Sequence, residues 1–145
     1  DIRPIVLEHE GVFGATYRKL HRLGAARWAC IFCKRTLLLK ACKIAEEHKA
    51  RALVTGENLG QVASQTLENL EAISYGVPKP IMRPLIAFDK AETMNLAKQI
   101  GTLEISTRDS PPCPYLPEYP ITTGRMSAFR EILAAVEGED AADPF

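Results

Sequence analysis

One stretch, ALVTGENLGQVASQTLEN at residues 52–69, constrains the fold of this chain more than any other. Its apolar start at 52–54 predicts a short β-strand. A turn with Gly56 and Gly60 follows, and the segment 61–74 predicts a helix. A strand, a glycine turn and a helix in this order place backbone N–H groups at the carboxyl end of a sheet, where α/β proteins bind anions. An ordinary strand-to-helix connection has the same pattern, so the stretch alone leaves both interpretations open.

The rest of the chain alternates predicted strands with predicted helices. The expected strands are 2–7, 52–54 and 81–86, and the expected helices are 11–23, 32–49, 61–74, 89–101 and 127–136. This alternation predicts an α/β fold with a parallel sheet and helices on both faces. Three strands are few for such a sheet, so we expect it to lack its first strands. Residues 1–136 are expected to form one unit, followed by a flexible acidic tail at 137–145.

Charge is distributed unevenly, although 18 Lys and Arg balance 18 Asp and Glu. Residues 1–60 contain 11 basic and 6 acidic side chains, whereas residues 104–145 contain 3 and 8. The basic excess would suit a polyanionic partner, but a solvated helix surface explains it equally simply. No apolar run approaches the roughly 20 residues of a membrane helix. With no secretory signal visible, we expect a cytoplasmic protein without membrane contact, whose four cysteines are thiols or metal ligands.

Three cysteines have the pattern of a metal or redox site. Cys30 and Cys33 form a Cys-x-x-Cys pair at a predicted loop–helix junction, and two thiols at this spacing can reach one metal or each other. Cys113 lies in a Pro-Pro-Cys-Pro loop, in which the prolines stiffen the backbone around the thiol. Three thiolates suit an iron–sulfur cluster with one open iron, or zinc with a fourth ligand. Three unrelated thiols are the alternative. Cys42 lies among apolar residues of a predicted helix and is expected in the core. The histidines have no metal spacing and are expected at the surface or at helix ends: His9, His21 and His48.

The dipeptide Asp89-Lys90 lies where the last predicted strand gives way to a helix. Asp89 and Glu92 have the spacing of a capping box, which predicts the start of that helix. Lys90 at this rim could neutralise phosphate charge, and a solvent-facing lysine in a first helical turn is the alternative. Neither 11–14 nor 56–60 has the form of a nucleotide P-loop.

The ordered segments of the chain resemble a known family. The matching segments are LVTGENLGQVASQTLENL (53–70), RPLIAFDKAE (83–92), AKQIGTLEIS (97–106) and the loop of Cys113. Together they resemble the tRNA 4-thiouridine synthetases, or tRNA sulfurtransferases, which are PP-loop ATP-pyrophosphatases. The resemblance implies a Rossmann-like adenine-nucleotide α-hydrolase fold. It also implies an enzyme that uses ATP and Mg²⁺ to adenylate the C4 oxygen of a tRNA uridine, after which sulfur displaces AMP.

The resemblance also implies roles for individual residues. The residues that match the nucleotide-side turn and its helix are Thr55, Gly56, Glu57, Gly60, Gln61 and Gln65. Lys90 of the Asp89-Lys90 pair matches a lysine associated with adenylation, and Cys113 matches the cysteine that handles sulfur. Cys30 and Cys33 match the archaeal type of the family. In that type, the pair and the loop cysteine are expected to hold an iron–sulfur cluster whose open iron carries sulfide.

One family motif is missing from these 145 residues: the Ser-Gly-Gly-x-Asp-Ser pyrophosphate loop. Since 2–7 resembles the third strand of the family's order, we expect the chain to be the C-terminal part of a PP-loop domain. It would then bind tRNA through upstream domains or a partner chain, and a separate donor would supply the sulfur. Homodimerisation or a missing domain would cover its incomplete sheet. The alternatives are sulfur transfer to another adenylated acceptor, and a truncated non-catalytic homologue or metal-binding partner subunit.

Overall fold

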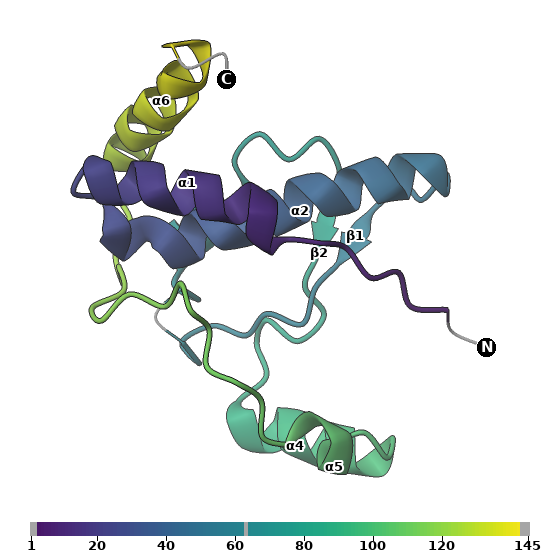
Figure 1. The fold of residues 1–145 in the computed structure, drawn as a ribbon. Helices are drawn as coiled ribbons and strands as arrows, with labels where there is room; N and C mark the ends of the chain where they lie inside the picture. The colour runs from purple at the N-terminus through teal and green to yellow at the C-terminus, as the bar shows by residue number, and fades with distance from the viewer. Residues whose placement is uncertain (1–2, 63, 143–145) are drawn as a thin grey trace.

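A computed structural model describes residues 3–62 and 64–142, and it shows a group of packed helices beside a small parallel sheet (Figure 1). The elements in order are α1 (Glu10–Arg22), the 3-10 helix η1 (Ala26–Trp28), α2 (Ala29–Glu47), β1 (Leu53–Val54), α3 (Leu67–Ser74), β2 (Ile81–Met82), α4 (Lys90–Gln99), α5 (Leu103–Ser106) and α6 (Met126–Ala142). The strands β1 and β2 pair in parallel, with Leu53 opposite Ile81. The predicted α/β fold with a parallel sheet is therefore confirmed. None of the helices in the described ranges is long and apolar enough to cross a membrane.

The core lies between helices rather than on the sheet. The helix α2 packs against α1, α3 and β1, and α6 packs against α1 and α3. Phe129 of α6 is fully buried, and its ring lies 5.3 Å from that of Phe32 and 6.3 Å from that of Trp28. Cys42 has only 2% of its surface exposed, which confirms its predicted place in the core. Two strands of two residues each offer little surface, so the helices supply the apolar contacts.

The sheet is covered on one face and open on the other. Leu53 is 9% exposed and belongs to the core together with the partly buried Ile81. Their neighbours Val54 and Met82 are 68% and 59% exposed. Because successive side chains of a strand point to opposite faces, the two exposed residues lie on the same face of the sheet. In α/β folds, helices cover both faces of a parallel sheet, whereas the described residues cover only one face of this sheet.

The helix ends follow sequence signals. At Gly24, just past the end of α1, the backbone has φ +67°, a conformation that glycine adopts without strain. The helix α4 starts at a full capping box: the Asp89 carboxylate accepts from the Glu92 amide, and the Glu92 carboxylate accepts from the Asp89 amide, both at 2.8 Å. The predicted helix starting at Asp89 is confirmed. The helices α4 and α5 lie apart from the other helices (Figure 1).

One predicted strand does not form among the described residues, and a second is shorter than predicted. Residues 3–9 have no regular structure, and residue 2 lies outside the described ranges. Pro4 cannot donate a ladder hydrogen bond, and neither β1 nor β2 pairs with this segment. The strand predicted at 81–86 ends at Met82, because Pro84 opens a turn. The sheet therefore has two strands among the described residues, where three were expected.

The helix predicted at 61–74 is also wrong in its first half. It begins only at Leu67, after Thr66, whose hydroxyl accepts a hydrogen bond from the amide of Asn69 at 3.3 Å. Val62 and Leu67 are 54% and 69% exposed. Gln61 and Gln65 therefore lie in the turn before α3 and not in the helix. At the other end of the chain, α6 continues to Ala142 and includes much of the expected flexible tail.

Candidate functional site

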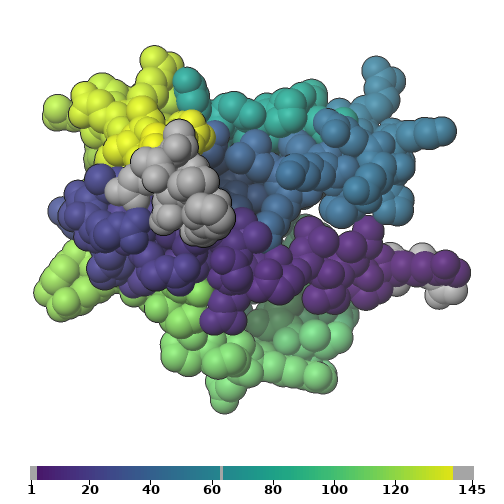
Figure 2. Space-filling view, turned by 45° about the horizontal axis from the view of Figure 1, so that its top comes forward, coloured from purple at the N-terminus to yellow at the C-terminus, as the bar shows by residue number. Residues whose placement is uncertain are grey.

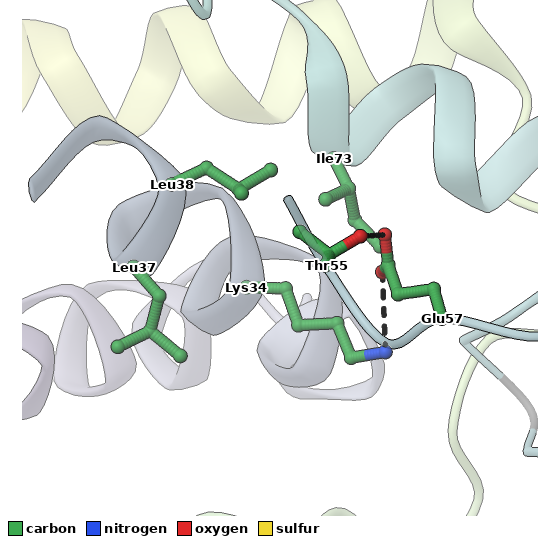
Figure 3. Close-up of a pocket in the computed structure, with 6 residues that line it drawn as sticks. All are labelled: Lys34, Leu37, Leu38, Thr55, Glu57 and Ile73. Atoms are coloured by element: carbon green, nitrogen blue, oxygen red, sulfur yellow. Dashed lines mark hydrogen bonds and ion pairs between the residues drawn. The ribbon is translucent and has the colours of Figure 1, made fainter. Parts of the chain in front are cut away.

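The turn that follows β1 is held in place by a buried carboxylate. Glu57 is 12% exposed, and its Oε2 accepts hydrogen bonds from Arg83 Nε at 2.8 Å and from the Thr55 hydroxyl at 3.2 Å. Lys34 Nζ of α2 lies 3.6 Å from Glu57 Oε1 (Figure 3). Arg83 also donates to Ser74 Oγ at 2.8 Å, so it joins the turn to the end of α3. These contacts neutralise the buried charge and fix the shape of the turn.

Asn58 joins the same turn to the region of Asp89 and Lys90. It is 8% exposed, and its Nδ2 lies 2.9 Å from Leu85 O, 3.2 Å from Phe88 O and 3.1 Å from Thr93 Oγ1. The side chain thereby holds the start of α4 against the turn. We did not single out Asn58 from the sequence, because its partners lie 27–35 residues away.

A first cavity of about 200 Å³ lies beside this turn (Figure 3). Its lining residues are Lys34, Leu37, Leu38, Thr55, Glu57 and Ile73. The apolar side chains come from α2 and α3, and the polar ones come from the turn and from Lys34. The cavity can thus hold a group with a flat apolar part and a polar rim.

The other residues expected to contact a nucleotide lie close by along the chain. Gly60 has φ +72°, so a residue with a side chain would be strained there. Gln65 Oε1 is buried and has no hydrogen-bond partner among the described residues, as expected of a group that awaits a ligand. Gln61 is exposed. Contacts of Gly56, Gly60, Gln61 and Gln65 with a nucleotide stay predictions.

A second cavity, of about 260 Å³, brings the three predicted cysteines together. Cys30 and Cys33 come from the N-terminal end of α2, which starts three residues earlier than expected, and Cys113 comes from the loop between α5 and α6. All three are free thiols. The further lining residues are Ala29, Lys34, Leu37, Ser64 and Tyr115. Because Lys34 lines both cavities, the nucleotide-side turn and the cysteines are neighbours.

The thiols influence each other electrostatically. Burial, together with the nearby Cys113 and Cys30, raises the pKa of Cys33 from 9.0 to about 11. Burial and Cys113 also raise the pKa of Cys30, while the ammonium of Lys34 opposes both shifts. Two or three thiolates are therefore unfavourable in this cavity unless a positive centre joins them. Among residues 3–62 and 64–142, no group of three or more His, Cys, Asp or Glu side chains is arranged to hold a metal ion.

The pKa of Cys33 gives a measurable pH dependence. At pH 8, iodoacetamide should alkylate Cys33 of the reduced, metal-free protein about 100-fold more slowly than a cysteine of pKa 9.0, because the thiolate fraction is about 100-fold smaller. The rate should rise about tenfold per pH unit and level off only near pH 11. Peptide mass spectrometry reports each cysteine separately, with exposed Cys113 as the internal comparison. A rate for Cys33 that levels off near pH 9 would contradict this prediction.

His9 is a neighbour of the cysteine cavity that we did not expect from the sequence. Its Nε2 lies 3.2 Å from the sulfur of Cys33, and its ring stacks on Phe13 with centroids 5.4 Å apart. Burial and the nearby Lys40 lower the pKa of His9, which favours the neutral ring. Since 24 residues separate His9 from Cys33, no local spacing could have indicated the contact. Its predicted place at a helix end is confirmed, because it is the N-cap of α1.

Asp89 and Lys90 lie outside both cavities as far as the described residues define them. The carboxylate of Asp89 caps α4, which gives it a structural task. Lys90 is the first residue of α4, and its side chain is exposed. Catalytic roles for this pair stay predictions, and the Asn58 contacts are what hold the pair near the turn.

Comparison with known proteins gives consistent similarities. The family model described as thiamine biosynthesis protein (ThiI) matches residues 6–137. A protein named "Probable tRNA sulfurtransferase" from Thermococcus kodakarensis is 42% identical over 123 residues, which are 85% of this chain and 32% of that protein. One of the same name from Methanocaldococcus jannaschii is 47% identical over 119 residues, which are 82% of this chain and 31% of that protein.

A solved structure is similar as well. The crystal structure of a 4-thiouridine synthetase–RNA complex with bound ATP superimposes with a TM-score of 0.71 at 38% sequence identity. The match covers 84% of this chain and 34% of that one. The chain thus spans about a third of the length of the curated relatives named above.

Proposed function

Because the chain belongs to the thiamine biosynthesis protein (ThiI) family, we propose that it is the sulfur-handling part of an ATP-dependent tRNA sulfurtransferase that makes 4-thiouridine. The observation that carries this proposal is the contact between the two cavities. The turn of Thr55 and Glu57 and the thiols of Cys30, Cys33 and Cys113 share Lys34 as a lining residue. An enzyme that adenylates a base and then replaces oxygen by sulfur needs both sites within reach of one atom.

In this proposal, the turn after β1 binds ATP for the adenylation step. In the proposed reaction the uridine O4 attacks the α-phosphorus of ATP, and pyrophosphate leaves. The unpartnered oxygen of Gln65 and the cavity lined by Thr55 support nucleotide binding here. Lys90 would balance phosphate charge from the start of α4, and Mg²⁺ would share that task. Residues that grip the pyrophosphate would come from outside these 145 residues.

The cysteine cavity serves the second step, in which sulfur replaces oxygen. A sulfur anion attacks C4 of the adenylated uridine, and AMP leaves with the former carbonyl oxygen. Cys113, which is exposed and lies on a loop, would be the thiol nearest to the substrate, whereas Cys30 and Cys33 are half-buried in α2. These three residues line one cavity and would hold an iron–sulfur cluster or, as the second candidate, a zinc ion. When bound, an iron–sulfur cluster would supply a place for the sulfur anion.

The proposal is tested in cells that lack the gene. We expect tRNA from the deletion strain to contain no 4-thiouridine by nucleoside mass spectrometry, and we expect the full-length gene to restore it. Unchanged 4-thiouridine in the deletion strain would contradict the proposal. Loss of a different thiolated nucleoside would instead support sulfur transfer to another adenylated acceptor.

Gln65 provides a test of the nucleotide side alone. The change Gln65→Ala should weaken ATP binding to the full-length protein about 5- to 10-fold, because one hydrogen bond of about 1 kcal/mol is lost from the complex. Isothermal titration calorimetry measures the dissociation constant. Gln99→Ala, at the end of α4, is the matched control and should bind ATP as the wild type does. Equal dissociation constants for the wild type and Gln65→Ala would exclude this residue from the ATP site.

A further inference from the structure

A groove on the surface of α1 has no part in the site described so far. Its volume is about 500 Å³, and it is lined by Tyr17, Arg18, His21 and Arg22. Arg18, His21 and Arg22 are exposed, and Tyr17 is half-buried. All four lie in the second half of α1, so the groove combines two guanidinium groups with two aromatic rings on one helical surface.

The aromatic rings continue from the groove to the cysteine cavity. The ring of His21 lies 4.6 Å from that of Tyr17, and the ring of Tyr17 lies 4.9 Å from that of Tyr115. Tyr115 lines the cysteine cavity and is two residues from Cys113. In the space-filling view the surface of α1 adjoins that of the loop that carries Cys113 (Figure 2). A linear polymer bound in the groove could therefore extend to the cysteine cavity.

The charged side chains of α1 are distributed unevenly along the helix. Glu10 lies in the first turn, and Lys19, His21 and Arg22 lie in the last turn. Negative groups of a ligand should therefore lie over the second half of α1, near Arg18 and Arg22, and away from Glu10. Positive charge beside aromatic rings is what proteins that bind single-stranded nucleic acid present to phosphates and bases.

We propose that this groove binds the single-stranded RNA segment that carries the target nucleotide. Phosphates lie on Arg18 and Arg22, and bases stack on Tyr17 and His21, so that the next base reaches Tyr115 and Cys113. The inference deepens the proposed tRNA thiolation and rests on it. An acidic protein segment could form ion pairs with the two arginines, but its carboxylates would not stack on the aromatic rings. The alternation of rings and guanidinium groups therefore favours RNA.

The test measures binding of an unmodified tRNA transcript to the full-length protein by fluorescence anisotropy at several salt concentrations. Arg18→Met should weaken binding about 3- to 10-fold and lower the slope of log Kd against log salt by about 1, because one phosphate contact is lost. Tyr17→Leu keeps an apolar side chain in the same place but removes the ring, and it should weaken binding about fivefold or more with an unchanged salt slope. Tyr17→Phe should restore wild-type binding.

A matched control separates this groove from general charge effects. Lys43→Met removes an exposed positive charge from α2, away from the groove, and should leave both affinity and slope unchanged. Wild-type affinity in both Arg18→Met and Tyr17→Leu would overturn the inference while leaving the proposed function standing. A loss with Arg18→Met but none with Tyr17→Leu would indicate a surface for any polyanion, and would also overturn it. Absence of tRNA binding by the wild type would overturn the inference and the proposed function together.

Discussion

Replacing Cys113 with alanine should abolish 4-thiouridine formation, with a rate reduced by a factor of about a thousand or more. Cys113 is one of the three thiols that would hold the sulfur-carrying group, and loss of a residue essential to a chemical step has effects on this scale. The expected loss is confined to the second step. Cys113 lines the thiol cavity and Thr55 lines the other cavity. The Cys113→Ala variant should therefore still release pyrophosphate when it is given ATP and tRNA. The measurement is a single-turnover assay that follows pyrophosphate and 4-thiouridine separately.

Cys42→Ala is the matched control for Cys113→Ala. Cys42 is 2% exposed in the helical core, so its loss creates a small cavity without touching the site. This variant should make 4-thiouridine at the wild-type rate at 25 °C. Thiolation by Cys113→Ala within tenfold of the wild-type rate would show that sulfur reaches the uridine without this thiol.

Replacing Asn69 with alanine should have the largest effect on stability. Asn69 of α3 is fully buried, its Nδ2 donates to Ile121 O at 2.9 Å, and its Oδ1 accepts from the amide of Gly124 at 2.9 Å. Without the amide side chain, both loop groups would be buried without these partners. Each such loss costs about 1–3 kcal/mol, so the free energy of unfolding should fall by about 2–6 kcal/mol.

The effect of Asn69→Ala should be local as well as global. Asn69 holds the segment 121–124, which ends the loop of Cys113, against α3 and Trp28. Hydrogen exchange of the Gly124 amide should accelerate more than that of the α2 core amides, and the melting temperature should fall. Asn95→Ala, at an exposed position of α4, is the control and should change the free energy of unfolding by less than about 0.5 kcal/mol. Unchanged exchange at Gly124 in Asn69→Ala would contradict the account.

Local signals in the sequence were sufficient for much of this structure. The capping box of Asp89 and Glu92 involves neighbours in sequence, so it fixed the start of α4 correctly. The cavity shared by Cys30, Cys33 and Cys113 was expected from their spacing and from the resemblance, and the structure brings them together. The short apolar run before the glycine turn was also correctly predicted as a parallel strand.

Long-range contacts decided the features that the sequence did not reveal. The stretch 61–66 has helical periodicity, but the left-handed Gly60 and the cap at Thr66 delay the start of α3. The carboxylate of Glu57 pairs with Arg83, which lies 26 residues away, so no local spacing could have indicated this contact. The partnership of His9 with Cys33 depends on how the segment before α1 crosses α2. None of these contacts leaves a periodic or spaced pattern in the sequence.

In the proposed enzyme, the turn after β1 and the cysteine cavity act on the same uridine. The most direct test incubates the full-length protein, loaded with iron and sulfide, with a tRNA transcript, Mg²⁺-ATP and a sulfide source. We expect one 4-thiouridine and one AMP per tRNA, and neither product when ATP is omitted. Formation of AMP without any 4-thiouridine, or of 4-thiouridine without ATP, would contradict the proposal.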